Sequence, residues 1–324
     1  MTPAPRPARA SGSVPKATVA PARRSLQGSP GAQVAAQAKV NLRLCVLARE
    51  AGGHHQLETL FLRLTLCDQV KVRVTDGERT LAITGSIDTS SLSAPEANLA
   101  WRAAEAYATA TGWPRGWAIE IEKKIPIGGG LGGGSADAGG VLRVLDAIAP
   151  KPLGTDALLN LAATLGADVP FLTCEHAYAL GWGRGERLLA LRPPPSREVM
   201  LLVPPFGVNT AEAYDWLAAS RSAVQSAVVA RLLDPMSLGT WEELAPLACN
   251  DFEPVVRARH PEVGIMAAAL RASGCAPVLM SGSGSTVFGV LPGTGSVAVA
   301  AASAGTVAVL TRTATRVEPV SDLG

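Results

Sequence analysis

The sequence of 324 residues contains few cysteines, and none of them form a closely spaced pair. The five cysteines stand at positions 45, 67, 174, 249 and 275, far apart and odd in number. The lack of C-x-x-C excludes the usual ligand spacing of a structural zinc site, and the odd count argues against a disulfide framework. We therefore expect buried, reduced thiols, as in a cytosolic protein, and no metal ligand set.

A long apolar run and a strong charge of one sign are also absent. The longest apolar run, near 296–310, is interrupted by Ser, Gly and Thr and is too short to span a membrane. The net charge is +2, but five basic residues and no acid lie in the first 38 residues, which leaves a net charge of −3 for the remainder. We therefore expect neither a nucleic-acid partner nor a membrane partner, and no obligate protein partner is evident.

The first 33 residues consist mainly of Pro, Ala, Arg and Ser without apolar periodicity, so we expect a disordered tail over 1–33. An acid-free start with Arg and Ser resembles an organellar transit peptide. The alternative is an extended N-terminus of a bacterial protein, which we favour because the tail is rich in proline and forms no amphipathic helix. The expected location is the bacterial cytoplasm, with plastid targeting as the minor alternative.

Glycine is abundant, and six of the 33 glycines surround one leucine in K-I-P-I-G-G-G-L-G-G-G-S-A-D, residues 124–137. The preceding segment, Trp117–Lys123, alternates apolar and polar residues and predicts a strand, whereas the following segment up to Ile148 has helical periodicity. Glycine allows a ligand to approach the backbone closely, and the first turn of a helix offers unpaired N–H groups with a partial positive charge. This order of strand, glycine loop and helix N-terminus predicts a phosphate-binding loop.

Three phosphate-binding motifs compete for this loop, beside the simpler alternative of a flexible surface loop. A Walker A motif requires G-K-[ST] at its end, and no lysine follows these glycines. The dinucleotide pattern G-x-G-x-x-G is satisfied by Gly128, Gly130 and Gly133, but it should open an early βαβ unit, and here antiparallel strands precede it. The third pattern, P-x-x-x-G-L-G-x-x-S-A, is matched in order from Pro126 to Ala136.

The rest of the chain predicts an α+β fold, an antiparallel sheet with helices in two unequal halves. In the first half we expect strands over Ala35–Leu47, 70–74 and, across a hairpin at Asp76-Gly77, 80–84, then helices over Ala97–Thr111 and from an N-cap at Thr155 to Leu165. In the second half we expect a strand over Glu198–Pro205, helices beginning near 211, 223, 241 and 261, two strands around a glycine turn at 282–285, and a short helix before a last strand over 306–311.

Six stretches, in order, carry a resemblance to a known family. They are A-K-V-N-L, H-H-Q-L-E-T-L-F, P-I-G-G-G-L-G-G-G-S-A, G-A-D-V-P-F, N-D-F-E-P-V-V and M-S-G-S-G-S-T-V-F-G. From Ala35 to the last strand, the chain resembles the GHMP superfamily of small-molecule kinases, which includes galactokinase, homoserine kinase and mevalonate kinase. The resemblance implies a ribosomal-protein-S5-domain-2-like ATP domain at 34–185, a ferredoxin-like substrate domain at 186–324, and an active site in the cleft between them.

Within this superfamily the six stretches are most similar to the branch that acts on a cytidine diphosphate derivative of a methylated sugar alcohol, in the non-mevalonate isoprenoid pathway. The resemblance implies transfer of phosphate from ATP, with Mg²⁺, to the tertiary 2-hydroxyl of that small molecule. One alternative is a kinase of the same fold that acts on homoserine or mevalonate. Another is a protein that binds a nucleotide without catalysis, against which the presence of both Lys39 and Asp168 argues.

Two residues are candidates for catalysis. Asp168 precedes Val-Pro-Phe, which would partly desolvate its carboxylate and make it a better base for the attacking hydroxyl. Its alternative role is that of a helix cap or turn residue. Lys39 stands within an apolar strand, where a cation is costly unless it is paired or functional. Its alternative is a solvent-facing position on an edge strand, but the resemblance places this lysine beside the aspartate.

The other site predictions concern ATP and the cytidine substrate. For ATP they are Pro126, Ile127, Gly128, Gly129, Gly130, Leu131, Gly132, Gly133, Gly134, Ser135 and Ala136, with Ser135 either capping the helix or contacting phosphate and Mg²⁺. For the substrate they are Asn41, His54, His55, Thr210 and Tyr214. The resemblance implies that His55 reads the cytosine edge and that His54 stacks on the ring, where the family usually has tyrosine.

Two further features complete the predicted site. Tyr214 should cover the opposite face of the cytosine, and its alternative is a core aromatic on an amphipathic helix. The turn Gly282, Ser283 and Gly284 could close over phosphates with its amides, and its alternative is a plain hairpin turn.

We predict that deletion of residues 1–30 leaves the melting temperature and the activity of the protein unchanged, because nothing in that segment can bury apolar area. Thermal unfolding and initial rates of the truncated and full-length chains provide the measurement. A large fall in melting temperature on truncation would show that the tail packs on the folded body.

Overall fold

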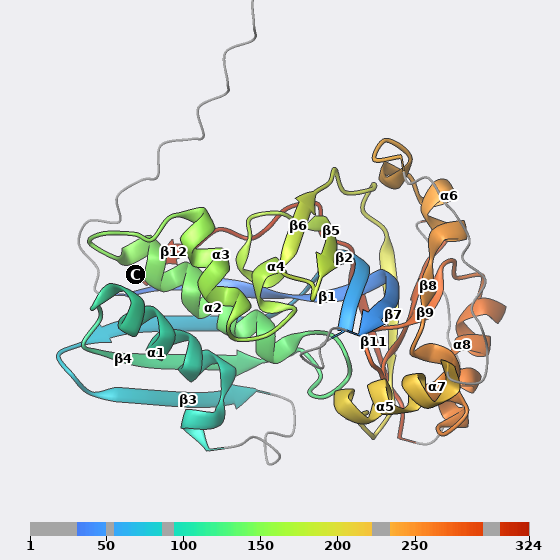
Figure 1. Ribbon diagram of the computed structural model, residues 1–324, viewed down its shortest axis with the longest axis horizontal. Helices are drawn as coiled ribbons and strands as arrows, with labels where there is room; N and C mark the ends of the chain where they lie inside the picture. The colour runs from blue at the N-terminus through green and yellow to red at the C-terminus, as the bar shows by residue number, and fades with distance from the viewer. Residues whose placement is uncertain (1–30, 50–54, 86–93, 222–233, 294–304, 324) are drawn as a thin grey trace, which may run out of the picture.

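The structure, a computed structural model, describes residues 31–49, 55–85, 94–221, 234–293 and 305–323 (Figure 1). The larger of its two sheets contains β1 (Gly31–Arg49), β2 (His55–Thr75), β3 (Arg79–Gly85), β4 (Gly116–Lys123), β5 (Tyr178–Gly183), β6 (Arg187–Ala190), β8 (Cys249–Asn250) and β12 (Ser321–Asp322). The smaller sheet contains β7 (Glu198–Val203), β9 (Val278–Met280), β10 (Val287–Val290) and β11 (Val307–Arg312). The predicted α+β fold is confirmed.

The helices divide between the two sheets. In the first half they are α1 (Leu99–Thr111), α2 (Gly133–Ile148), α3 (Thr155–Ala163) and α4 (Val169–Thr173), preceded by a short 3₁₀ turn over Pro95–Ala97. In the second half they are α5 (Thr210–Arg221), α6 (Trp241–Leu244), α7 (Glu253–Arg257) and α8 (Pro261–Ala272), with 3₁₀ turns over Ser237–Gly239 and Ala245–Leu247. Within the described residues, no helix is both long and apolar enough to cross a membrane.

The antiparallel pair of β1 and β2 is the longest feature of the larger sheet, with strands of 19 and 21 residues. The pairing runs from Gly31 opposite Arg73 to Arg49 opposite His55 and contains three register shifts. Strand β1 therefore starts before the expected boundary, and residues 31–33 belong to the sheet rather than to a tail. The physical reason is that Ala32, fully buried, is held between β2 on one side and β12 on the other.

The expected hairpin at Asp76-Gly77 is wrong, because β4 lies between β2 and β3. Strand β4 pairs antiparallel with β2 and parallel with β3. Ile119 and Ile121 of β4 are 1% exposed, whereas five of the seven residues of β3 are exposed. The more apolar strand therefore takes the interior position, and β3 becomes the edge of the sheet.

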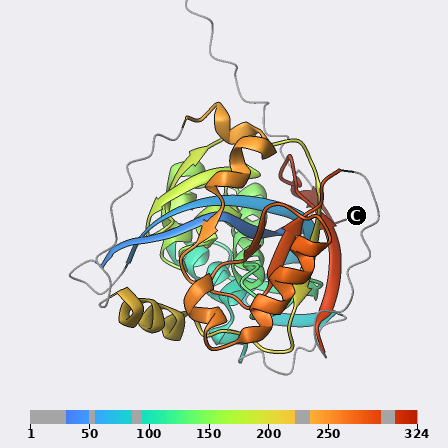
Figure 2. The same ribbon diagram turned by 90° about the vertical axis from the view of Figure 1, so that its right-hand side faces the viewer.

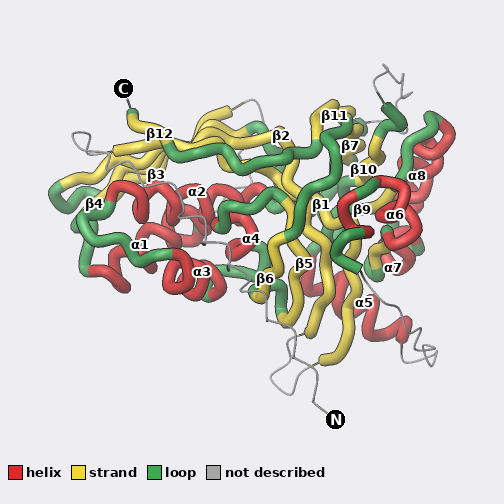
Figure 3. Tube along the Cα trace, turned by 90° about the horizontal axis from the view of Figure 1, so that it is seen from above, coloured by secondary structure: helices red, strands yellow, loops and turns green. Residues whose placement is uncertain are grey.

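Helices α1, α2 and α3 lie side by side on one face of this sheet (Figure 3). The predicted end of α1 is confirmed, since Gly112 closes it with a φ of 72°, while the side chain of Asn98 accepts a hydrogen bond from Ala100 N at its start. The N-cap prediction for α3 is wrong. Gly154 occupies that position, and Thr155 is already the first helical residue.

The smaller sheet has the order β11-β7-β10-β9. Helix α8 packs on β9 and β10, α7 packs on α8, and α5 packs on α7. Figure 2 looks at this end of the molecule, with the orange helices of the second half in front. The strand predicted at 198–205, the strands around the glycine turn and the helix starts near 211, 241 and 261 are confirmed. The helix start near 223 and the short helix before the last strand lie outside the described residues. After β11 the chain returns to the larger sheet, where Ala314 N donates to Arg63 O at 2.9 Å.

Candidate active site

Lys39 and Asp168 lie together, as the sequence predicts. Lys39 Nζ is 3.1 Å from Asp168 Oδ2 and also donates to Asn41 Oδ1 at 2.8 Å. The side chain of Lys39 is 3% exposed and that of Asp168 is 31% exposed. The amide of Asn41 in turn donates to Thr59 Oγ1 at 2.8 Å. Lys39 is therefore an interior, paired cation rather than a solvent-facing lysine, and its carboxylate partner remains open to a ligand.

The backbone holds Asp168 immediately before α4, but its side chain forms no capping hydrogen bond. This geometry therefore does not support the alternative role of the Asp168 side chain as a helix cap. The next three residues, Val169, Pro170 and Phe171, are buried, which anchors the turn while the carboxylate faces Lys39. Because the carboxylate satisfies no backbone donor of α4, it is available to a substrate hydroxyl.

Arg63 supports the other end of α4, and sequence analysis missed it. Its Nη2 donates to Phe171 O at 2.7 Å and Cys174 O at 2.9 Å, and its Nε donates to His176 O at 3.2 Å. Arg63 is 1% exposed, and burial lowers its pKa to about 10. It stands directly opposite Lys39 in the β1–β2 register. The sequence does contain a signal for this residue, because an arginine inside the apolar run L-F-L-R-L is expected to be buried and paired.

The glycine loop has backbone angles that other residues would strain. Gly128, Gly130 and Gly132 have φ values of 73°, 79° and 73°. A Cβ on Gly130 would lie 2.1 Å from Ser281 O, so the approach of the two segments also requires glycine there. Gly132 is the N-cap of α2 without a side-chain cap bond. Ser135 is therefore in the first turn of α2, where the amides have no intrahelical acceptor and can bind an anion.

The glycine loop is fixed from both sheets. On one side, Lys39 N donates to Leu131 O at 3.0 Å. On the other side, Thr286 N donates to Gly129 O at 3.2 Å, and Ser281 Oγ donates to Gly130 O at 2.9 Å. The predicted phosphate loop thus sits where the two sheets meet.

The turn at 282–284 packs against the glycine loop and is not a plain, solvated hairpin turn. A Cβ on Gly282 would lie 3.1 Å from Gly130 O and 3.4 Å from Lys39 Nζ. Asn250 Nδ2 braces the turn from behind, with donations to Met280 O at 2.7 Å and Gly282 O at 2.8 Å. In front, the hydroxyls of Ser283 and Thr210 are 2.9 Å apart. The structure thereby brings both predicted residues to the edge of the loop.

His55 and Tyr214 also come together, but they stack directly on each other. Their ring centroids are 4.5 Å apart with an interplanar angle of 12°. Phe252, which sequence analysis missed, contacts Tyr214 edge-on at 4.9 Å. Burial first, and then the charge of Asp168, raise the pKa of Tyr214 to about 12, so the stack lies within electrostatic reach of the carboxylate. His54 lies outside the described residues.

A cavity of about 230 Å³ opens beside the loop and α1. Its wall includes Ile83, Asn98 and Leu99, none of which was predicted, together with glycines of the loop. Lys123 and Asp137 also line it. Lys123 Nζ contacts Asp68 Oδ2 at 2.5 Å and Asp137 Oδ2 at 2.6 Å.

Asp137 has one buried carboxyl oxygen, Oδ1, without a hydrogen-bond partner in the described part of the chain. Burial raises the pKa of Asp137 to about 8, against the opposing effect of Lys123. The cluster therefore combines one cation with two carboxyl groups, and burial favours the neutral form of Asp137.

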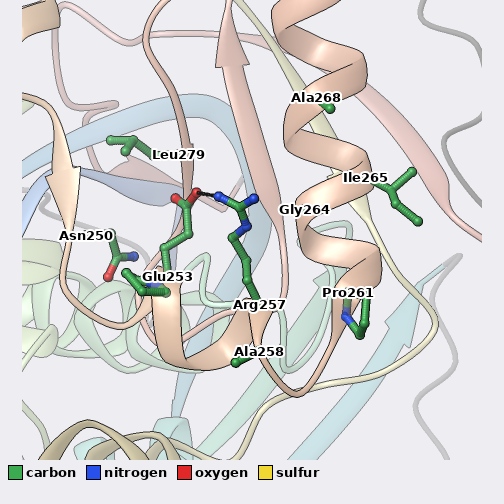
Figure 4. Close-up of a pocket in the computed structure, with 10 residues that line it drawn as sticks. Asn250, Glu253, Arg257, Ala258, Pro261, Gly264, Ile265, Ala268 and Leu279 are labelled. Carbon is green, nitrogen blue, oxygen red and sulfur yellow. Dashed lines mark ion pairs between the residues drawn. The ribbon is translucent and has the colours of Figure 1, made fainter. Parts of the chain in front are cut away.

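A second, larger cavity of about 830 Å³ lies between α7, α8 and β9 (Figure 4). It contains the Glu253–Arg257 ion pair, with 3.8 Å between Oε1 and Nη1, and Glu253 Oε2 accepts a hydrogen bond from Met280 N at 3.0 Å. None of the predicted site residues lines this cavity, so its size does not make it the reaction site. Across the described ranges, no cluster of three or more His, Cys, Asp or Glu is arranged to hold a metal ion.

Comparison with known proteins gives two family matches. Residues 98–176 match the GHMP kinases N terminal domain, and residues 227–307 match the GHMP kinases C terminal domain. The chain is 38% identical over 258 residues to the 4-diphosphocytidyl-2-C-methyl-D-erythritol kinase of Geobacter sp. (strain M21), with 80% of this chain and 89% of that protein covered. It is 35% identical to the protein of the same name from Bacillus pumilus (strain SAFR-032), with 79% and 86% covered.

Solved structures show the same similarity. A crystal structure of 4-(cytidine 5'-diphospho)-2C-methyl-D-erythritol kinase is 34% identical, with a TM-score of 0.68 over 87% of this chain and 98% of that chain. Homoserine kinase from Cytophaga hutchinsonii is 15% identical, with a TM-score of 0.60 over 92% and 98%. The latter likeness shows a shared fold and nothing about the substrate.

We predict that Arg63→Met lowers the free energy of unfolding by about 2–5 kcal/mol. The substitution removes the donor of Cys174 O and leaves Phe171 O with only the weak thiol donor of Cys174, and an unpaired buried group costs about 1–3 kcal/mol. Urea denaturation measures the change. Arg316→Met, at a side chain 80% exposed, is the matched control and should be neutral. Equal stability of the two variants would contradict the supporting role of Arg63.

Proposed function

The chain belongs to the 4-diphosphocytidyl-2-C-methyl-D-erythritol kinase family of the GHMP kinases, and on that basis we propose how its residues divide the reaction among themselves. It transfers a phosphoryl group from ATP to the 2-hydroxyl of 4-diphosphocytidyl-2-C-methyl-D-erythritol, giving the 2-phosphate and ADP. The observation that carries the assignment of roles is the 3.1 Å contact of Lys39 with Asp168 beside the glycine loop.

The loop from Pro126 to Ala136 binds the phosphates of ATP. Its support is the N-terminus of α2, where unpaired amides and the helix dipole favour an anion. The 230 Å³ cavity beside it receives the nucleoside, because apolar side chains of β3 and α1 line it next to the glycines of the loop. Mg²⁺ would neutralise charge on the phosphates, and Ser135, in the first turn of α2, is the side chain that we propose to hold it.

Asp168 acts as the base. The substrate 2-hydroxyl gives its proton to the carboxylate as the oxygen attacks the γ-phosphorus, and ADP leaves from the opposite side. Lys39 holds the Asp168 carboxylate in place through the 3.1 Å contact and reduces the charge on the transferring group. In phosphoryl transfer, positioning and charge stabilisation supply most of the rate. The Gly282–Gly284 turn approaches Gly130 and Lys39 closely. It can add the amides of Gly282 and Ser283 as donors, whereas Gly284 N already donates to Ser281 O.

The cytosine binds on Tyr214. For a base to stack between His55 and Tyr214, the two ring centroids would have to be about 7 Å apart, which is twice the contact separation of carbon atoms. The centroids are 4.5 Å apart, so the two rings leave no room for a base between them. Phe252 holds Tyr214 from the side, whereas His55 is the first described residue of β2. We therefore infer that the base takes the place of His55 on the Tyr214 ring and that His55 turns its edge to the base. Thr210 and Asn41 then face the diphosphate and the hydroxyl-bearing end.

Several earlier expectations stay predictions. They are the domain division after residue 185, the cytoplasmic location and the absence of an obligate protein partner. The stacking role of His54 stays a prediction as well.

The substrate assignment is tested by incubation of the protein with ATP, Mg²⁺ and a panel of alcohols. The panel contains the diphosphocytidyl compound, homoserine, mevalonate and galactose, and phosphate transfer is followed for each. We expect transfer to the diphosphocytidyl compound, because the other three offer no base for His55 and Tyr214. Comparable transfer to homoserine or mevalonate would overturn the assignment.

His55→Ala is predicted to raise KM for the cytidine substrate far more than KM for ATP, since a lost base-edge hydrogen bond leaves a polar group unpaired. Steady-state kinetics with each substrate varied in turn provide the test. His176→Ala, at an exposed histidine, is the control and should change neither constant. A selective rise in KM for ATP would place His55 in the nucleotide site instead.

Asp168→Asn keeps size and most hydrogen bonding but cannot accept the proton. A positioned base contributes about 10²- to 10⁴-fold in rate, so kcat should fall within that range while both KM values change little. Lys39→Met keeps the apolar stem, removes the charge and should lower kcat comparably.

The double variant of Lys39 and Asp168 should be little slower than either single variant, because two groups that act as a unit give non-additive effects. Losses that multiply would mean that the residues work independently. If Asp168→Asn kept nearly full kcat, the reaction would need no protein base at this position.

A further inference from the structure

Two cysteines that are 204 residues apart in sequence meet beside the active site and have no part in phosphoryl transfer. Cys45 of β1 and Cys249 of β8 place their Sγ atoms 3.5 Å apart. The two strands run parallel, with Arg43 opposite Cys249 and Leu44 opposite Asn250. Both thiols are half-buried, so a small molecule can reach them, whereas Cys174 and Cys275 are buried.

The charges around the pair make one thiol the nucleophile. Arg43 Nη1 donates to Cys249 Sγ at 3.3 Å, and Arg43 itself is held by Glu58 at 2.6 Å. The hydrogen bond from Cys45 and the nearby guanidinium lower the pKa of Cys249 to about 7, against burial. The same hydrogen bond and burial raise the pKa of Cys45. A thiolate with a pKa near ambient pH is the best attacking group in thiol–disulfide exchange, and here its resolving thiol is already in contact.

We propose that Cys45 and Cys249 form a reversible disulfide with small-molecule disulfides, such as oxidised glutathione, as the oxidant. The Cys249 thiolate attacks one sulfur of the oxidant, whose S–S bond breaks, and one glutathione thiolate leaves. Cys45 then loses its proton to solvent and attacks Cys249 Sγ, which expels the second glutathione. Two protein thiols are oxidised and one glutathione disulfide is reduced to two thiols. The sulfur atoms need to approach by about 1.5 Å to reach bonding distance.

Closure of this bond changes the active site through the residues that follow Cys249. Asn250 Nδ2 holds the Gly282–Gly284 turn through hydrogen bonds to Met280 O and Gly282 O. Asp251 N donates to Leu44 O at 3.0 Å, and Asp251 Oδ2 accepts from Val46 N at 2.8 Å. A shift of β8 toward β1 therefore displaces the donor that positions the turn. Since a misplacement of 1 Å can cost about 10²-fold in rate, we expect the oxidised form to be at least about tenfold slower.

The test treats the full-length protein with oxidised glutathione and maps its disulfides by mass spectrometry under non-reducing conditions. We expect a linked Cys45–Cys249 peptide pair, loss of two titratable thiols, a fall in activity and recovery of both with dithiothreitol. Cys45→Ser should stop at a glutathione adduct on Cys249, and Cys249→Ser should leave Cys45 unmodified. Cys67→Ser, at a half-buried thiol elsewhere in the larger sheet, is the control and should behave as the unaltered protein.

Two results would overturn the proposal. The first is that the protein keeps all five thiols, or forms a disulfide between a different pair, at a ratio of oxidised to reduced glutathione that oxidises a model dithiol. The other is a Cys45–Cys249 bond that leaves the rate unchanged, which would remove the link to the turn. The thiol count and the peptide map do not depend on the kinase assignment, and only the rate rests on the proposed function. A failure of one is therefore distinguishable from a failure of the other.

Discussion

The register of β1 against β2 is the constraint on which the active site depends. It places Lys39 directly opposite Arg63, so two buried cations face each other across the strands. Like charges in that position destabilise a sheet unless each is compensated. The compensation comes from α4, since Asp168 at its start pairs with Lys39 and the carbonyls at its end accept from Arg63. A slip of either strand by one residue would turn its cation to the other face of the sheet, and α4 would lose one of its two partners.

The glycine loop follows from a second constraint, the close approach of two sheets. Three of its carbonyls accept hydrogen bonds from outside the loop, one from β1 and two from the segment after β9. A side chain at Gly130 would collide with the backbone of that segment. The glycines thus serve the contact between the sheets as well as the proposed phosphate binding, because the protein uses the carbonyls while the amides of α2 remain for a ligand. Because β1 and the segment after β9 already hold the loop, it would need little reorganisation on binding ATP. Donors that are pre-organised in this way contribute to the rate of a reaction.

The parts of this site that the sequence predicted are those whose signal is local. The glycine loop, the lysine in an apolar strand and the aspartate before Val-Pro-Phe can each be recognised within about ten residues. The insertion of β4 between β2 and β3 could not be recognised in this way, because Asp-Gly favours a hairpin locally and only burial of Ile119 and Ile121 against the core decides the order.

Long-range partners escaped prediction for a related reason. The acceptors of Arg63 Nη2 are carbonyls 108 and 111 residues away, and a carbonyl has no signature in a sequence. The direct stack of His55 on Tyr214 depends on how α5 docks against the end of β2, which periodicity does not determine.

The buried charges beneath the loop bear on the phosphate binding that we propose for this site. Asp137 lies near the start of α2, where an ionised carboxylate would oppose the positive end of the helix dipole and repel a triphosphate. Burial raises the pKa of Asp137 to about 8, which disfavours that ionised form. The contacts of Lys123 with Asp68 and Asp137 also anchor the strand before the loop to the helix after it. The amides of the first turn and Lys39 are therefore the groups that we propose to face the phosphates.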